Sequence, residues 1–315
     1  MTDMRIVFMG TPDFATGVLE SMVKNNCQVV GIITAPDRPA GRGQQVKISS
    51  VKEFALAKAL PLLQPVNLKD EAFLKELKLL NADLQVVVAF RMLPEAVWKM
   101  PKMGTFNLHA SLLPDYRGAA PINWAIINGE TKTGVTTFFI DDKIDTGAII
   151  LQKETEISSD QNAGVLHDIL MRLGAEAVIE TLQKIASGNM QTVPQLEPII
   201  QKNAPKLTKE NSRIDWHKSG NEISNQIRGL SPYPGAWCNF INEGEEMFVK
   251  IYEASFSAEK LDADSLKIVI DRKQLKIALP DGHLNVHSVQ LPGKKKMVVG
   301  ALLNGMTFDA NAFAG

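Results

Sequence analysis

Short apolar runs alternate with longer stretches of helical periodicity through the first 188 residues. The runs, several of them ending at a glycine or polar residue, are typical of strands buried in a sheet. Such alternation predicts an α/β fold, with a Rossmann-like, mostly parallel sheet covered by helices on both faces. Ligands of such sheets bind beyond the carboxyl ends of the strands. The predicted strands are 5–10, 27–34, 82–90, 104–111 and 134–140, and the helical patterns are 13–26, 49–60, 121–129 and 162–188.

The pattern changes after residue 188. Residues 189–207 contain three prolines and no clear period, which indicates a linker. One helical stretch follows, and then short apolar strands separated by turn residues, which predicts a small C-terminal β-barrel of OB-like type. We therefore expect three segments: a catalytic domain at 1–188, a linker at 189–207 and a β-barrel domain at 208–315.

Composition excludes several classes of protein. The chain is 45% hydrophobic with a formal net charge of −1, so no global field favours nucleic acid or membrane. Its two cysteines, Cys27 and Cys238, form neither a disulfide framework nor a metal motif. No long apolar run predicts a signal peptide or a membrane span. We expect a cytoplasmic monomer without a membrane partner or a metal.

Asn107 and His109 lie two residues apart near the end of a predicted strand, so both point to one face. An amide donor beside an imidazole could stabilise a developing oxyanion. A packed core histidine with a neighbouring turn asparagine is the structural alternative. A further strand is followed by Asp141, Asp142 and Asp145, one of which could orient the imidazole and stabilise its cation. The alternative is a solvated turn, and spacing does not choose among the three carboxylates.

Three other segments have weaker signals. Residues 35–52 form a long Gly- and Pro-rich stretch with four basic residues and one acid, so it could reach a phosphate backbone or form a solvated loop. The run "MGTPDF" after the first strand has one glycine, which makes a dinucleotide site a weak interpretation. Residues 208–315 hold thirteen Lys and Arg and thirteen Asp and Glu, so basic contacts there are confined to small patches such as 294–296.

Several motifs together resemble the 10-formyltetrahydrofolate-dependent formyltransferases over nearly the whole chain. They are "FNLHASLLPDYRGAAPINWAIINGE", "TGVTTFFIDDKIDTGAIIL", "GTPDFA", "RIDW" and "IRGLSPYPGAW". The resemblance implies that Asn107, His109 and Asp145 are catalytic. It implies that the folate co-substrate contacts Arg91, Met92, Leu93, Ser111, Leu112, Leu113, Pro114 and Asp142. Arg91 replaces a small residue of the family pattern, and Asp115 stands where the family has a basic or neutral residue.

The resemblance also implies the reaction and its partners. A formyl group would pass from 10-formyltetrahydrofolate to the α-amine of methionine esterified to initiator tRNA, without a metal. Asn107 and His109 would stabilise the oxyanion, and Asp145 would orient His109. The implied tRNA contacts are Arg38, Arg42, Lys47, Lys206 and Lys209, with Arg42 reading the end of the acceptor stem.

Three alternatives share this scaffold. One is a formyltransferase for a small amine, another is a hydrolase or dehydrogenase domain, and the third is a non-catalytic RNA-binding protein. An intact Asn107, His109 and Asp145 argues against the last.

Overall fold

The computed structural model describes residues 3–40, 45–188, 190–196 and 202–315. The chain forms two compact units that interleave in sequence. The first unit comprises residues 1–118, 133–155 and 167–203, and the second comprises 119–132, 156–166 and 204–315. The domain boundaries expected from the sequence remain a prediction. Among the described residues, no helix has the length and apolar character needed to cross a membrane.

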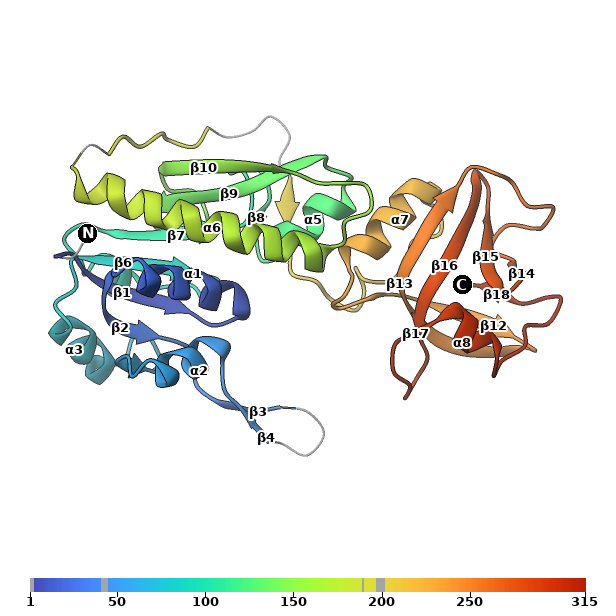
Figure 1. The fold of residues 1–315 in the computed structure, drawn as a ribbon, viewed down its shortest axis with the longest axis horizontal. Helices are drawn as coiled ribbons and strands as arrows, with labels where there is room; N and C mark the ends of the chain where they lie inside the picture. Colours follow the sequence, from blue (N-terminus) through green and yellow to red (C-terminus); the bar gives the residue numbers. More distant parts are fainter. Residues whose placement is uncertain (1–2, 41–44, 189, 197–201) are drawn as a thin grey trace. The chain divides into compact units, whose positions relative to one another are not determined.

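A seven-stranded sheet forms the centre of the first unit (Figure 1). Its strand order is β10-β9-β7-β6-β1-β2-β5. The pairs β1–β2, β1–β6, β6–β7 and β2–β5 are parallel, and β7–β9 is antiparallel, which confirms the predicted mostly parallel sheet. The strands are β1 (Arg5–Gly10), β2 (Gln28–Ile33), β5 (Leu62–Leu63), β6 (Leu84–Val88), β7 (Thr105–His109), β9 (Lys132–Phe139) and β10 (Ile149–Glu156).

Helices cover both faces of this sheet. The close approach of Gly17 in α1 to Met171 in α6 brings these two helices side by side on one face, where Leu108 of β7 packs against Gly174. On the other face, apolar side chains of α3 and α4 form a core with alternate residues of the central strands. The helices of this unit are α1 (Asp13–Lys24), α2 (Ser50–Ala57), α3 (Glu71–Leu79), α4 (Glu95–Trp98) and α6 (Ala163–Ala186), whose first residues belong to the second unit.

Local sequence sets where two of these helices begin. Ser49 accepts a hydrogen bond from the backbone N–H of Lys52 at the start of α2. Asp70 accepts from the N–H groups of Ala72 and Phe73 at the start of α3. These contacts satisfy backbone donors that have no partner within the helix.

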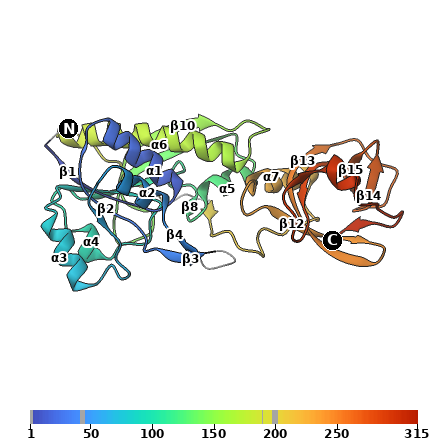
Figure 2. The same cartoon turned by 60° about the horizontal axis from the view of Figure 1, so that its bottom comes forward.

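The basic stretch between β2 and α2 is partly a hairpin rather than an irregular loop. Strands β3 (Arg38–Ala40) and β4 (Gln45–Lys47) pair antiparallel, and the hairpin projects from the first unit (Figures 1 and 2). Asp37 anchors its base, because its carboxylate accepts hydrogen bonds from Lys52 at 2.5 Å and from Gln64 at 2.8 Å.

The second unit is a nearly closed antiparallel barrel, as the sequence predicts. Its strand path is β14-β15-β16-β13-β12-β18, with β17 paired to β16. A bridge between Lys267 and Phe313 joins the two ends of this path. The strands are β12 (Ala236–Asn242), β13 (Glu245–Ser257), β14 (Ile268–Asp271), β15 (Gln274–Leu279), β16 (Gly282–Gln290), β17 (Met297–Val298) and β18 (Phe313–Ala314).

Three helices accompany the barrel, and one of them, α7 (Gly220–Gly229), begins with a full capping box. Ser219 accepts from the N–H of Glu222, whose carboxylate accepts from the N–H of Ser219. The barrel interior and these helices share one core of buried, mostly apolar side chains. The helices are α5 (Pro121–Ile127), α7 (Gly220–Gly229) and α8 (Val299–Leu303), and the short strands β8 (Arg117–Gly118) and β11 (Asn203–Ala204) complete the chain.

Candidate active site

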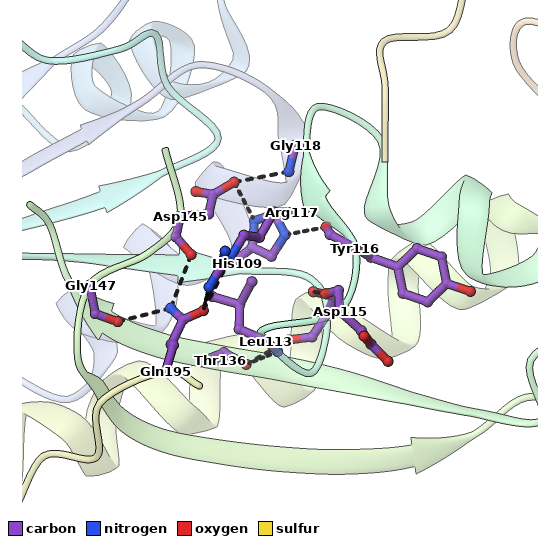
Figure 3. Close-up of polar contacts among 11 residues, drawn as sticks. His109, Leu113, Asp115, Tyr116, Arg117, Gly118, Thr136, Asp145, Gly147 and Gln195 are labelled. Carbon is purple, nitrogen blue, oxygen red and sulfur yellow. Dashed lines mark hydrogen bonds and ion pairs between the residues drawn. The ribbon is translucent and has the colours of Figure 1, made fainter. Parts of the chain in front are cut away.

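His109 is the last residue of β7 and is only 6% exposed. Its Nε2 lies 2.8 Å from the backbone oxygen of Tyr116 (Figure 3). A backbone carbonyl can only accept, so Nε2 carries the proton of this hydrogen bond. The contact fixes the plane of the ring at the carboxyl end of a sheet strand, where α/β folds place their ligands.

Asp145 lies opposite, in the loop between β9 and β10. Its Oδ2 is 3.8 Å from His109 Nδ1 and accepts a hydrogen bond of 3.0 Å from the backbone N–H of Gly118. Asp141 is instead occupied by Thr146 and the N–H of Lys143 within its own turn, and Asp142 is exposed. Of the three carboxylates, Asp145 is therefore the one that faces the imidazole.

Both nitrogens of the His109 ring face acceptors. Nε2 faces a carbonyl oxygen and Nδ1 faces a carboxylate. The two acceptors lie at opposite edges of the ring, so together they set the orientation of the imidazole.

Asn107 lies on the same face of β7, two residues before His109. Leu108, between them, packs on α6, so strand alternation turns Asn107 and His109 toward the opposite side of the sheet. The Asn107 amide is partly exposed and makes no hydrogen bond within the part of the chain that the structure describes. It is an available donor on the strand face that His109 also occupies.

The loop after His109 is tied to the neighbouring strands. Thr136 Oγ1 donates to the backbone oxygen of Ser111 and accepts from the N–H of Leu113, at 2.7 and 3.1 Å. Gln152 Nε2 donates to Leu113 O at 2.8 Å. Ser111 and Leu113 are buried, whereas Leu112 and Pro114 are half-buried, so the backbone of this predicted folate element is held in place while some side chains reach solvent.

The predicted folate contacts at residues 91–93 differ in their exposure. Arg91 donates to the backbone oxygens of Pro65 and Val66, and its burial, together with the nearby charge of Arg38, lowers its pKa. Met92 is 70% exposed. Leu93 is buried in the core beneath α3 and α4. Arg91 and Met92 can therefore meet a ligand directly, and Leu93 supports them from inside.

The predicted tRNA contacts lie in both units. Arg38 and Lys47 are exposed, and they lie opposite each other in the register of the β3–β4 hairpin of the first unit. Arg42 lies outside the described residues. Lys206 and Lys209 are exposed in the second unit, and Lys209 Nζ lies 5.4 Å from the centre of the Trp237 ring.

Contacts from the predicted linker were missed by sequence reasoning. Gln195 donates to the backbone oxygens of Asp145 and Gly147 and accepts from Arg117. No periodicity or motif marked this residue, because its partners are 48 to 78 positions away in sequence.

Among the described residues there is no group of three or more His, Cys, Asp or Glu side chains placed to hold a metal ion.

Comparison with known proteins identifies relatives over the full chain. Residues 4–182 match the family described as formyl transferase, and residues 206–307 match the formyl transferase C-terminal domain. A methionyl-tRNA formyltransferase of Flavobacterium johnsoniae is 62% identical over 312 residues, covering 99% of each chain. One from Bacteroides fragilis is 52% identical and covers 96% of this chain and 95% of its own.

A solved structure shares the fold at much lower identity. It is WlaRD, described as a sugar 3N-formyl transferase in the presence of dTDP and 5-N-formyl-THF. Its TM-score is 0.66 at 22% identity, and the match covers 93% of this chain and 99% of that one.

Proposed function

Because this chain belongs to the formyl transferase family, we propose that it transfers the formyl group of 10-formyltetrahydrofolate to the α-amine of methionyl initiator tRNA. The observation that carries the proposal is 62% identity to a methionyl-tRNA formyltransferase across 99% of both chains. The arrangement of His109 and Asp145 supports the proposal. The product would serve translation initiation in the cytoplasm, with the chain acting as a monomer.

The site suits a formyl donor. Attack of an amine on a formyl carbon places negative charge on the formyl oxygen, which calls for hydrogen-bond donors at that position. The Asn107 amide is an available donor, and His109 lies two residues further along the same face. Arg91 and Met92, with the loop 111–114, are the residues that would hold the folate, and exposed Asp142 lies on the adjoining loop.

Asn107 and His109 stabilise the developing charge in this proposal. A well-placed donor such as the Asn107 amide contributes about 3 to 4 kcal/mol to the transition state. Asp145 Oδ2 lies 3.8 Å from His109 Nδ1, and an imidazole that carries a proton there would stabilise an oxyanion more strongly than a neutral ring does.

Asp145 also receives the proton that the attacking amine must lose. Its carboxylate is a half-buried acceptor with one oxygen shared between Gly118 N and His109 Nδ1. The second oxygen can take the proton directly or through one water. When the tetrahedral intermediate collapses, the bond between the formyl carbon and N10 of the folate breaks, and N10 takes up that proton to leave as tetrahydrofolate. Asp145 thus orients the imidazole and serves as the general base.

Recognition of the tRNA rests on local basic groups, because the chain as a whole carries a net charge of −1. Arg38 and Lys47 of the β3–β4 hairpin, and Arg42 between them in sequence, bind the acceptor stem in this proposal, and Lys206 and Lys209 of the second unit contact phosphates. Binding that depends on such contacts weakens as salt rises, because the phosphates release counterions on binding.

The proposed boundaries remain 1–188 for catalysis, 189–207 for the linker and 208–315 for the tRNA-binding barrel.

Single-turnover formyl transfer tests the assignment. Methionyl initiator tRNA and methionyl elongator tRNA are compared side by side with 10-formyltetrahydrofolate as donor, together with a small amino sugar nucleotide as a third acceptor. We expect fast transfer to the initiator alone. Transfer to the small amine, or folate hydrolysis without transfer, would retain the active site and overturn the acceptor.

A further inference from the structure

The side-chain amide of Gln195 joins three parts of the loops around His109 and Asp145 (Figure 3). Its Nε2 donates to Asp145 O at 3.0 Å and to Gly147 O at 2.8 Å. Its Oε1 accepts from Arg117 Nε at 3.2 Å and from Arg117 Nη2 at 2.8 Å. A guanidinium can only donate and a carbonyl can only accept, so these partners fix the orientation of the amide.

The segment that carries Gln195 is held by polar contacts rather than by packing. Val193 exchanges two backbone hydrogen bonds with Ile149, at 2.8 and 2.9 Å, which fixes the segment beside the start of β10. The side chains of Val193 and Leu196 are 62% and 82% exposed, so neither fills a core. Among the residues described in this segment, Gln195 is the one whose side chain hydrogen-bonds to the loop that carries Asp145.

The backbone that Gln195 holds is one that needs support. Asp145 has φ of +56°, in a region that non-glycine residues rarely adopt and that persists where the surroundings determine it. The carbonyls of Asp145 and Gly147 lie on either side of Thr146, and a single nitrogen bonds both. This contact fixes the backbone beside the Asp145 carboxylate, while Gly118 N fixes the carboxylate itself.

We propose that Gln195 is a positioning residue for formyl transfer, acting through Asp145 by holding its loop in the conformation that faces His109. This inference rests on the proposed function, since it assigns Gln195 a part in that reaction. Gln195 itself touches neither reacting group. Arg117 donates to the oxygen of the Gln195 amide. One side chain therefore holds both the loop 110–118 and the loop 141–147.

Two substitutions separate the contacts. Gln195→Ala removes all of them, and Gln195→Glu keeps an acceptor for Arg117 but turns an oxygen toward two carbonyl oxygens. We expect each to lower the single-turnover rate constant about 10- to 100-fold, because misplacing a catalytic group by about 1 Å costs on that order. The dissociation constants for folate and tRNA should stay within about twofold. A Gln195→Glu variant with wild-type rate would overturn the proposal, since it would show that the loop contacts do not matter.

A double-mutant cycle with Asp145→Ala tests whether Gln195 acts through Asp145. In that background, Gln195→Ala should lower the remaining rate by less than about twofold, because the group it positions is gone. A full additional loss would overturn the proposal. Gln85→Ala is the matched control: its Oε1 accepts from Thr105 Oγ1 at the opposite end of β7, so it lowers the melting temperature and leaves the rate constant of folded enzyme unchanged.

A crystal structure of the Gln195→Ala variant separates this inference from the proposed function. We expect the Asp145 carboxylate to move away from His109 Nδ1, whatever the acceptor of the formyl group proves to be. An unmoved loop would overturn the positioning role. Wild-type enzyme that fails to formylate initiator tRNA while the loop moves in the variant would overturn the acceptor assignment alone.

Discussion

Gly147 leaves no room for a side chain beside the Asp145 loop. A methyl group added at this residue would lie 1.7 Å from the backbone oxygen of Phe139 and 2.8 Å from its carbonyl carbon. Close C···O contacts in proteins are about 3.3 Å, so Gly147→Ala requires a displacement of about 1.6 Å. The N–H of Phe139 donates to Ala148 O at 3.0 Å, so Phe139 cannot retreat without breaking the pairing next to this loop.

The displacement falls on residues that place Asp145. Gly147 O accepts from Gln195, and Asp145 lies two residues away. Because the hydrogen bonds between β7 and β9 resist movement of the strands, the loop moves instead. A shift of about 1 Å at a catalytic group can cost about 100-fold in rate. We therefore expect Gly147→Ala to lower the single-turnover rate constant by about 100-fold or more, with little change in the dissociation constant for tRNA.

The assay is single-turnover formyl transfer at saturating folate and tRNA, with melting temperature measured on the same preparations. Gly300→Ala is the control, since a methyl group there meets nothing within 4 Å and the residue lies in helix α8 of the other unit. It should leave both rate and melting temperature near wild type. A Gly147→Ala variant that is folded and within threefold of the wild-type rate would refute the reasoning.

Three further substitutions have predicted outcomes. His109→Ala should lower transfer by about 100- to 1000-fold while filter binding shows an unchanged affinity for tRNA, because the ring stabilises charge and does not grip the acceptor. Arg42→Ala should retain folate binding and reduce the preference for initiator over elongator tRNA in competition assays; an unchanged preference would remove Arg42 from recognition. Hydrogen bonds from Lys52, and to a smaller extent from Gln64, lower the pKa of Asp37 in the folded protein. The Asp37 carboxylate therefore stabilises the fold fully above its ordinary pKa, and this stabilisation is lost as pH falls through its pKa in the folded state. The difference in melting temperature between wild type and Asp37→Asn should therefore be constant above about pH 5 and disappear in strong acid.

The sequence was informative wherever a local pattern decides the structure. Continuous apolar runs predicted buried strands, and β6 is buried at all five positions. Strand alternation predicted that Asn107 and His109 share a face, and the packing of Leu108 on α6 is consistent with this. These inferences need only the two-residue period of a strand and the covering of both faces by helices.

Local pattern could not choose among three carboxylates within five residues. The choice depends on the positive φ of Asp145 and on a backbone donor, Gly118 N, which is 27 positions away. The resemblance to the family selected Asp145, whereas spacing left Asp141 and Asp142 equally open. Gln195 was missed for a related reason: its segment has no period, and its role consists of contacts made after the chain has folded.

Most of the groups that arrange this site belong to the backbone, which explains why one side chain departs from the family pattern without disturbing it. Asp115 presents its backbone oxygen to Ser111 Oγ at 2.6 Å, and any residue supplies that oxygen. Its carboxylate points instead toward Lys202, at 3.8 Å, where both side chains are well exposed. An exposed pair of this kind contributes little to stability, so an acid, a base or a neutral residue can occupy the position. The site restricts the conformation of the loop at residue 115, and it leaves the identity of that side chain free to vary.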